Sequence, residues 1–387
     1  MKKKLDQKKI LLFTRPLVPP WDEGSKNLAF QIALHSQGDF CFHLLTDQSG
    51  LLEKELPFEK KLCLKTEPLF FSGRLDWKNK TQLMKRIFQP NLKADLIHFL
   101  FTPRLVTSRI FRWRLKNKPV KTIQTIATLN DEWVDKPQLA KKILFADLVV
   151  AQSRHTLQRL EKLGLNARLI YPGIDLKKFI PTGQDENLGK ELGIHPNDFV
   201  LLFTGEYDRL EATDDILEAF YLLEKQKQTE KLKIILACRL KTARDRKIKQ
   251  TVQTEIARRG WKKNFVFLDF AEDMVKLYNL ADLNIFPVRK MAGKFDIPLV
   301  LIESMACGKP VLVSDLPVLR ELIQDDSNGV VVPAANPEKL AEKILWLKNN
   351  PETNQKLGQA GRQTAQQLFD IEETSKRYEE VYQQILK

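Results

Sequence analysis

Residues 293–315 read GKFDIPLVLIESMACGKPVLVSD, and this stretch decides the fold. It predicts a loop, a helix, an abrupt stop and a short buried strand. Asp296 can cap a helix whose first turn contains Pro298, since the N–H that proline lacks has no helical partner there. Gly308 can adopt the left-handed backbone conformation that ends many helices, and a buried strand over 311–313 follows it.

One residue does not fit this apolar helix. Glu303 lies in the middle of VLIESMA, which is apolar on nearly all sides. Its carboxylate either faces one wet edge beside Ser304 or holds a ligand that offers two hydrogen-bond donors. Lys294, in the loop before the helix, lies at the positive end of the helix dipole, an arrangement that suits a phosphate.

The length and composition predict two domains in a reducing compartment. A chain of 387 residues is too long for one core, and 43% hydrophobic residues is an ordinary globular composition. The four cysteines have no metal-ligand spacing, so we expect free thiols. No apolar run has the length of a bilayer span, and the basic N-terminus lacks the apolar segment of a signal peptide. We expect a cytoplasmic protein.

The excess positive charge lies in the first half of the chain. Residues 1–190 contain 34 Lys and Arg against 19 Asp and Glu, a net charge of +15. Residues 191–387 contain 29 Lys and Arg against 30 Asp and Glu, a net charge of −1. We therefore expect one domain to meet an anionic surface and the other not to.

Strands and helices alternate along both halves, which predicts doubly wound parallel sheets. The strand 10–14 precedes a loop and a helix from Ser25 to about residue 37. Gly24 and Ser25 could offer backbone N–H groups to an anion at the helix start; the alternative is a glycine turn and a serine N-cap. Further strands are predicted at 41–45, 96–100, 121–126, 148–151, 199–205, 233–239, 264–270, 283–288 and 329–333. First-half helices are predicted at 81–88, 105–116, 138–145 and 156–163, and two helices close the chain, the second over 370–386.

The best candidate for a linker follows RLIYPGIDLKKF, residues 168–179, where a polar, glycine-rich segment begins. We expect a basic N-terminal domain over 1–180, a linker over 181–197, a C-terminal domain over 198–368 and a final helix over 369–387.

Two segments, 73–93 and 103–121, carry most of this positive charge. In the second, basic and aromatic residues are interleaved, which is typical of a helix that rests on anionic lipid headgroups. We expect the membrane contact at Arg109, Arg112, Trp113 and Arg114, which would make the protein peripheral on the inner face of the cell membrane. The alternatives are nucleic-acid binding and a solvated face whose Phe111 and Trp113 point into the core.

The order of elements, together with several motifs, resembles the retaining family-4 glycosyltransferases of the GT-B fold over nearly the whole chain. The motifs are LVLIESMACGKPVLVSD (299–315), YNLADLNIFPV (278–288), NGVVVP (328–333), LIYPGIDLKKF (169–179) and ADLVVAQSRHT (146–156). Any one of them alone would be a weak signal, but their combination is specific.

The resemblance implies two Rossmann-like domains that face each other across a cleft. The C-terminal domain would hold a nucleotide-sugar and the N-terminal domain an acceptor, the last helix would cross back to the first domain, and no metal would be required. Glu303 matches the family's residue that accepts the hydroxyls of the nucleotide ribose, so we favour this role over the wet edge. Negative charge develops on the leaving diphosphate, which therefore needs positive groups and N–H donors.

Three positions depart from the family pattern. The family has a second Glu eight residues before Glu303, where this chain has Phe295; the flanking Lys294 and Asp296 are our catalytic candidates. The Arg that commonly follows the glycine of the first donor-domain strand is Glu206 here. The His of a T-x-H motif is Ala127.

The remaining candidates follow from the same resemblance. The donor-binding candidates are Gly24, Ser25, Gly205, Arg209, Arg239, Lys294, Leu299, Val300 and Glu303. A solvated loop is the alternative for Arg239. His98 matches another histidine position of the family and is a third catalytic candidate, although a histidine in an apolar strand is more often a core residue with satisfied hydrogen bonds.

The sequence thus predicts a retaining glycosyltransferase of the hexosyltransferase type. It would move a sugar from a nucleoside-diphosphate sugar to an acceptor such as a lipid-linked or cell-envelope saccharide. The alternative is a non-catalytic GT-B scaffold or binding protein, which the three departures support. Nucleic-acid binding ranks last, because no nucleic-acid motif accompanies the charge.

Overall fold

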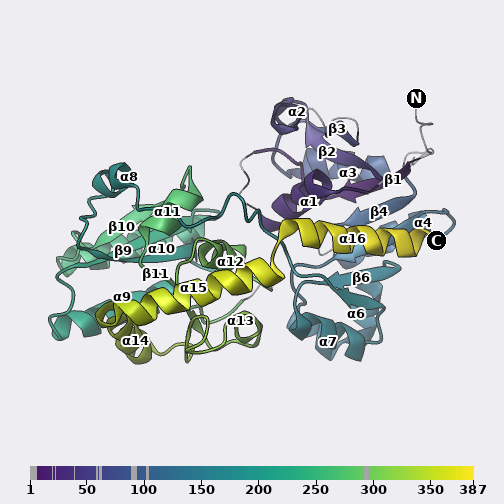
Figure 1. Cartoon of the computed structure of the whole chain (residues 1–387). Coiled ribbons are helices and arrows are strands. Elements are labelled where there is room, and N and C mark those ends of the chain that lie inside the picture. The colour runs from purple at the N-terminus through teal and green to yellow at the C-terminus, as the bar shows by residue number, and fades with distance from the viewer. Residues whose placement is uncertain are drawn as a thin grey trace. The chain divides into compact units, whose positions relative to one another are not determined.

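The computed structural model describes residues 7–19, 21, 23–38, 40–57, 60, 63–88, 94–101, 104–291 and 296–387. The chain divides into two compact units, one of Met1–Gly173 with Ile371–Lys387 and the other of Ile174–Asp370. Each unit is a parallel sheet covered by helices (Figure 1). The predicted fold class, two doubly wound α/β units, is confirmed. All four cysteines are free thiols, as predicted.

Within the described residues, the first unit has a seven-stranded parallel sheet in the order β3-β2-β1-β4-β5-β6-β7. The strands are β1 Lys8–Phe13, β2 Phe40–Asp47, β3 Leu64–Phe70, β4 Leu96–Phe99, β5 Lys121–Thr125, β6 Leu148–Ala151 and β7 Ala167–Leu169. Strands β4 and β6 are buried along their whole length, as apolar strands covered on both faces should be.

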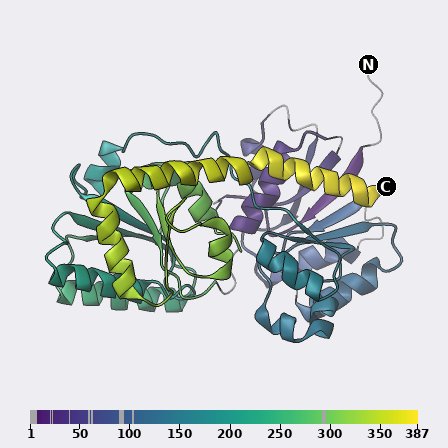
Figure 2. The same ribbon diagram turned by 60° about the horizontal axis from the view of Figure 1, so that its bottom comes forward.

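Helices cover this sheet (Figures 1 and 2). They are α1 Gly24–His35, α2 Leu51–Glu55, α3 Trp77–Phe88, α4 Leu105–Leu115, α5 Asp131–Asp135, α6 Pro137–Ile143, α7 Arg154–Lys162 and α16 Ile371–Leu386. The C-terminal α16 packs on α1, where Ser375 donates to the Ile32 carbonyl at 2.8 Å. Glu379 accepts from the backbone N–H groups of Gln37 and Gly38, at 2.7 and 3.0 Å. The last helix is therefore an integral part of the first unit.

Within the described residues, the second unit has a six-stranded parallel sheet in the order β10-β9-β8-β11-β12-β13. The strands are β8 Phe199–Glu206, β9 Leu232–Arg239, β10 Phe265–Leu268, β11 Leu283–Phe286, β12 Val311–Ser314 and β13 Val330–Val332. The helices are α8 Glu186–Glu191, α9 Thr213–Lys225, α10 Ala243–Arg258, α11 Met274–Leu280, α12 Leu299–Ala306, α13 Pro317–Leu322, α14 Pro337–Asn349 and α15 Pro351–Leu368.

The stretch 293–315 folds largely as predicted. Gly308 has a φ of +71° and ends α12, and β12 follows. Lys309 N–H then donates to the Ser304 carbonyl at 3.1 Å, which completes the turn. The predicted cap is wrong: α12 begins at Leu299 with Pro298 as its N-cap and no side-chain cap bond.

Two other expectations are corrected. Three helices follow the last strand instead of two, because Pro351 cannot continue α14 and starts α15. Strand β3 was not expected, since LKTEPLF is polar and contains Pro68. This strand lies at the edge of the sheet, so one of its sides forms no hydrogen bonds with another strand, and a proline is tolerated there.

Candidate functional site

The strand order of the second unit indicates where a ligand can bind. Strands β9 and β10 lie on one side of β8, and β11, β12 and β13 lie on the other. In doubly wound sheets, ligands bind at the carboxyl ends of the strands, where the order reverses. The segments after β8 and β9 and the helix α12, which follows β11, all reach this edge.

A buried carboxylate gathers three cations at this edge. Glu206, the last residue of β8, has a side chain only 4% exposed and pairs in register with Arg239 of β9. Arg209 donates from Nη2 to its two carboxylate oxygens at 2.7 and 2.9 Å. Arg239 Nη2 and Lys241 Nζ each lie 3.2 Å from Oε1. We call these four residues the Glu206 cluster; three cations around one carboxylate leave an excess of positive charge.

The loop after β8 is folded tightly and fixed to its neighbour. A Cβ atom at Gly205 would meet the Phe203 ring at 2.7 Å and Leu210 at 2.9 Å, so any larger residue would require these side chains to shift. Arg289, after β11, donates its backbone N–H to the Leu210 carbonyl at 3.1 Å. Its guanidinium also makes a bidentate pair with Asp215, at 2.7 and 3.1 Å. The loops on the two sides of the reversal point are thereby held together.

Glu303 of α12 is half-buried and bonded to α11. Its Oε2 accepts a 2.7 Å hydrogen bond from the Tyr278 hydroxyl. Burial raises the pKa of Glu303 above its ordinary value, whereas the Tyr278 bond and the charge of Lys178 lower it. Ser304, which would share a wet edge, is fully buried. Because each carboxylate oxygen has two acceptor positions, Glu303 can keep the Tyr278 bond and still accept other donors.

The other predicted residues of this stretch divide into two groups. Lys294 and Phe295 lie outside the described residues. Asp296 is buried, and Leu299 and Val300 form the half-buried first turn of α12. The start of α12 therefore brings the described candidates of this stretch to the same edge as Gly205.

In the first unit, Gly24 and Ser25 form the first turn of α1, whose N–H groups have no partner within the helix. The alternative assignment of Ser25 as N-cap is wrong, because the N-cap is Glu23. Arg15 pairs with Glu23 at 2.5 and 2.7 Å, which closes the loop between β1 and α1.

His98 is buried within the first unit. Its ring nitrogens lie 2.8 Å from the Tyr382 hydroxyl and 2.7 Å from the Thr125 hydroxyl, and Thr125 in turn lies 3.0 Å from the Tyr378 hydroxyl. Burial lowers the pKa of His98 to about 3. Both ring nitrogens thus have partners, one in α16 and the other in β5, which favours the core role over the catalytic one.

The helices α3 and α4 present a basic and aromatic surface. Trp113 is 72% exposed and Trp77 71% exposed, whereas Phe111 is buried in the core. Arg109 and Arg112 are exposed and Arg114 is half-buried. A hollow of about 320 Å³ lies on α3, lined by Lys80, Thr81, Met84, Lys85 and Phe88. Among the described residues, no helix combines the length and apolarity needed to cross a bilayer.

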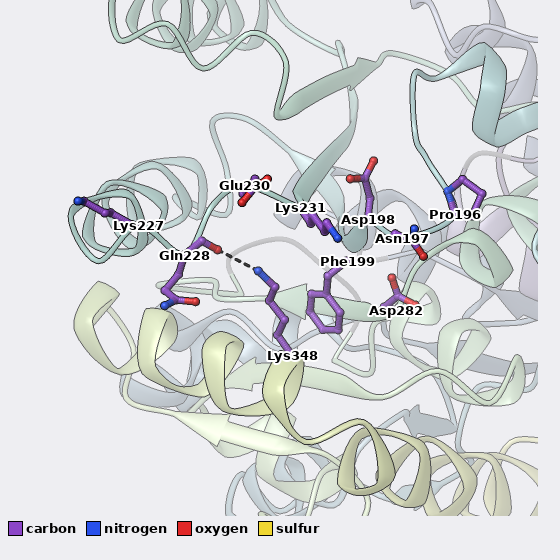
Figure 3. A pocket seen from close by; sticks show the side chains of 10 residues that line it. All are labelled: Pro196, Asn197, Asp198, Phe199, Lys227, Gln228, Glu230, Lys231, Asp282 and Lys348. Atoms are coloured by element: carbon purple, nitrogen blue, oxygen red, sulfur yellow. Dashed lines mark hydrogen bonds between the residues drawn. The ribbon is translucent and has the colours of Figure 1, made fainter.

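A larger hollow of about 510 Å³ lies at the opposite, amino edge of the second unit's sheet (Figure 3). Its lining residues are Pro196, Asn197, Asp198, Phe199, Lys227, Gln228, Glu230, Lys231, Asp282 and Lys348. Lys348 donates to the Gln228 carbonyl at 3.0 Å, and Asp282 accepts from the Val200 N–H at 2.7 Å. The three lysines balance three acids, and the hollow lies away from the carboxyl ends, so we do not assign the site to it.

Sequence reasoning missed Lys241, Tyr278 and the cation-binding role of Glu206. Tyr278 stood in a motif used for the resemblance, but only the structure joins its hydroxyl to Glu303. Lys241 follows β9 directly after Arg239 and Leu240, and its position just past a strand's carboxyl end was a usable signal.

Comparison with known proteins agrees with this geometry. Residues 184–364 match the family model "Glycosyl transferases group 1". The chain is 28% identical to EpsD of Bacillus subtilis over 196 residues, which are 50% of this chain and 48% of that protein. It is 24% identical to a D-inositol 3-phosphate glycosyltransferase of Jonesia denitrificans, over 66% of this chain and 63% of that protein. The matched regions thus span less than two thirds of these relatives.

Solved structures show the same fold. An Anabaena protein, Alr3699/HepE in complex with UDP and glucose, superposes with a TM-score of 0.76 at 18% identity, covering 97% of this chain and all of that one. The sucrose-phosphate synthase of Thermosynechococcus elongatus gives a TM-score of 0.76 at 20% identity, covering 98% and 99%. Most of the second unit thus matches the glycosyl transferases group 1 model, and the whole chain shares its fold with these solved structures.

Proposed function

We propose that this chain is a retaining glycosyltransferase that moves a sugar from a nucleoside-diphosphate sugar to an acceptor. The observation that carries the proposal is Glu303, an acid on an otherwise apolar helix beside the carboxyl edge where the strand order reverses. A half-buried carboxylate with acceptor positions to spare suits the vicinal hydroxyls of a ribose.

The leaving diphosphate needs positive charge, which this chain can supply from its own side chains. Arg209 and Arg239 lie at the carboxyl ends of neighbouring strands and keep side chains that are 36% and 31% exposed. Such cations stabilise the charge that develops on the diphosphate. We therefore propose that the reaction requires no metal, and that Lys294, Asp296, Leu299 and Val300 line the sugar end of the donor site.

In the proposed division of roles, the second unit holds the donor and the first unit the acceptor. Gly24 and Ser25 support a contact with an anionic group, because the first turn of α1 offers backbone N–H donors. The UDP complexes of the Anabaena structure make UDP-sugars the first donors to try.

We also propose that the acceptor is lipid-linked or part of a cell-envelope saccharide, reached at an anionic membrane surface. The support is the basic and aromatic surface of α3 and α4. Exposed tryptophans beside arginines and lysines bind the interface between headgroups and acyl chains.

The test is incubation of the purified protein with UDP-, GDP- and ADP-sugars, with and without EDTA. Slow release of the nucleoside diphosphate from one donor, insensitive to EDTA, is the expected result. The Glu303→Gln variant serves as the control and should release less. If no donor is hydrolysed and no nucleoside diphosphate raises the melting temperature, the non-catalytic scaffold is the better description.

A further inference from the structure

We propose that Glu206 is a positioning residue that holds Arg209, Arg239 and Lys241 as one anion site, and that this site takes the diphosphate of a nucleoside diphosphate. The inference rests on the proposed function. It adds Lys241 to the donor-binding residues and gives a role to Glu206.

The first argument is the number of cations on one carboxylate. A buried carboxylate is costly unless it is paired and hydrogen-bonded, but one arginine that contacts both of its oxygens already provides a pair and hydrogen bonds. Arg209 contacts both oxygens of Glu206. Arg239 and Lys241 nevertheless converge on Oε1. The cluster thus brings together more positive charge than Glu206 requires.

The second argument is the contrast with the neighbouring loops. There, each ion pair joins one cation to one acid: Arg289 with Asp215, Lys290 with Glu211 and Arg244 with Asp208. Each of these pairs is electrically balanced. In the Glu206 cluster, by contrast, three cations meet one acid.

The third argument is how the cations are held. Glu206 ends β8 and Arg239 ends β9, and the register sets them side by side. The tight packing around Gly205 fixes the backbone just before Glu206. Long side chains normally lose conformational entropy when they bind a ligand, so cations that are already gathered bind at a lower entropic cost.

The chemistry of the cluster selects the ligand. Two guanidinium groups offer planar pairs of N–H donors that match phosphate oxygens, and the ammonium of Lys241 adds a point charge. The cation side chains are 31–36% exposed, so a ligand can reach them without unfolding the loop. A diphosphate supplies several oxygens and more than one negative charge, which three cations can share.

The first experiment separates the phosphates from the base. Binding of UDP, GDP and ADP, and of the corresponding nucleosides, is measured by titration calorimetry for the wild type and Lys241→Met. We expect the variant to bind the preferred nucleoside diphosphate about tenfold more weakly, with nucleoside binding unchanged. Lys249→Met is the matched control, since Lys249 has the same charge but pairs with Asp269; it should bind as the wild type does.

The second experiment tests positioning by a double-mutant cycle. If Glu206 positions Lys241, then Lys241→Met should weaken binding about tenfold in the wild type but less than threefold in Glu206→Gln. Melting temperatures show that each variant is folded. Equal effects in both backgrounds overturn the positioning role, and unchanged binding by Lys241→Met overturns the anion site. In both cases the wild type still binds nucleoside diphosphates, so the proposed function stands; if the wild type binds none, that function fails and the inference fails with it.

Discussion

The Tyr278 hydroxyl donates a 2.7 Å hydrogen bond to Oε2 of Glu303 and joins α11 to α12. The bond opposes the effect of burial, which raises the pKa of Glu303. Burial, and then the charge of Glu303, raises the pKa of Tyr278 well above its ordinary value, so this hydroxyl stays a donor. The Tyr278 hydrogen bond thus partly offsets the effect of burial on this acid.

Removing the tyrosine hydroxyl should shift the pH dependence of donor binding. In Tyr278→Phe the pKa of Glu303 rises further, because the hydrogen bond to the ionised form is lost. A protonated Glu303 accepts two ribose hydroxyls less well than an ionised one. As the pH is lowered, the variant should therefore lose donor binding at a higher pH than the wild type does. Nucleoside-diphosphate affinity measured from pH 4 to 8 checks this. An unshifted acid limb would contradict the role of Glu303 in ribose binding.

Replacing Glu303 with a neutral residue should stabilise the fold and weaken donor binding. Because folding raises the pKa of Glu303, its carboxyl loses its proton at a lower pH in the unfolded chain than in the folded protein. As the pH rises from the ordinary pKa to the folded-state pKa, this group therefore lowers the free energy of unfolding. Glu303→Gln should therefore raise the melting temperature at pH 7.5 but not at pH 4. The affinity for a nucleoside diphosphate should fall by about tenfold or more, since a charged acceptor is lost.

Calorimetry at the two pH values and titration with the nucleotide provide both readouts. Ser304→Ala, next to Glu303 and fully buried, is a control that should leave the affinity unchanged. A Glu303→Gln protein that binds as tightly as the wild type would exclude Glu303 from the donor site.

Local signals in the sequence were enough for most of the fold. The helix stop at Gly308 needs only a residue that accepts a positive φ, and the apolar runs mark strands that are buried on both faces. Strand β3 carries neither signal, because an edge strand can be polar. The cap expected at Asp296 failed because Pro298 already supplies the N-cap backbone.

The site was less predictable, because its contacts depend on pairing between distant segments. Glu206 and Arg239 meet only through the register of β8 and β9. His98 meets Tyr382, which lies 284 residues later in the chain. The sequence could therefore supply candidate residues by type, but not the partner that determines what each one does.

Replacing His98 should change the acid stability of the first unit. With its pKa lowered to about 3, the folded protein keeps His98 neutral, whereas the unfolded chain binds a proton below about pH 6.5. The wild type should therefore lose about 1.4 kcal/mol per pH unit from this group as the pH falls from about 6.5 toward 3. His98→Gln should be less stable at pH 7, by about 1–3 kcal/mol, but should have a flatter acid profile.

Urea unfolding at several pH values measures both effects. His195→Gln is the matched control, because His195 is exposed and its replacement should leave the profile unchanged. If His98→Gln keeps wild-type stability but loses transferase activity, the catalytic assignment of His98 would be right and the core role wrong.

The basic and aromatic surface of α3 and α4 should bind anionic membranes. Flotation with vesicles of phosphatidylglycerol should recover the protein, and neutral phosphatidylcholine vesicles should not. Trp113→Ala should reduce recovery because an exposed indole no longer enters the interface, and Arg112→Glu should reduce it further by reversing a charge. Each change should weaken the partition coefficient by about fivefold or more, given about 1 kcal/mol per basic residue.

Phe270→Ala is the matched control, because Phe270 is 65% exposed but belongs to the second unit, outside this surface. Its recovery should equal that of the wild type. Equal flotation with both kinds of vesicle would contradict membrane binding by charge. Salt-sensitive binding of RNA that Arg112→Glu and Arg114→Glu weaken, without any vesicle binding, would instead assign the same surface to nucleic acid, because phosphate contacts release counterions.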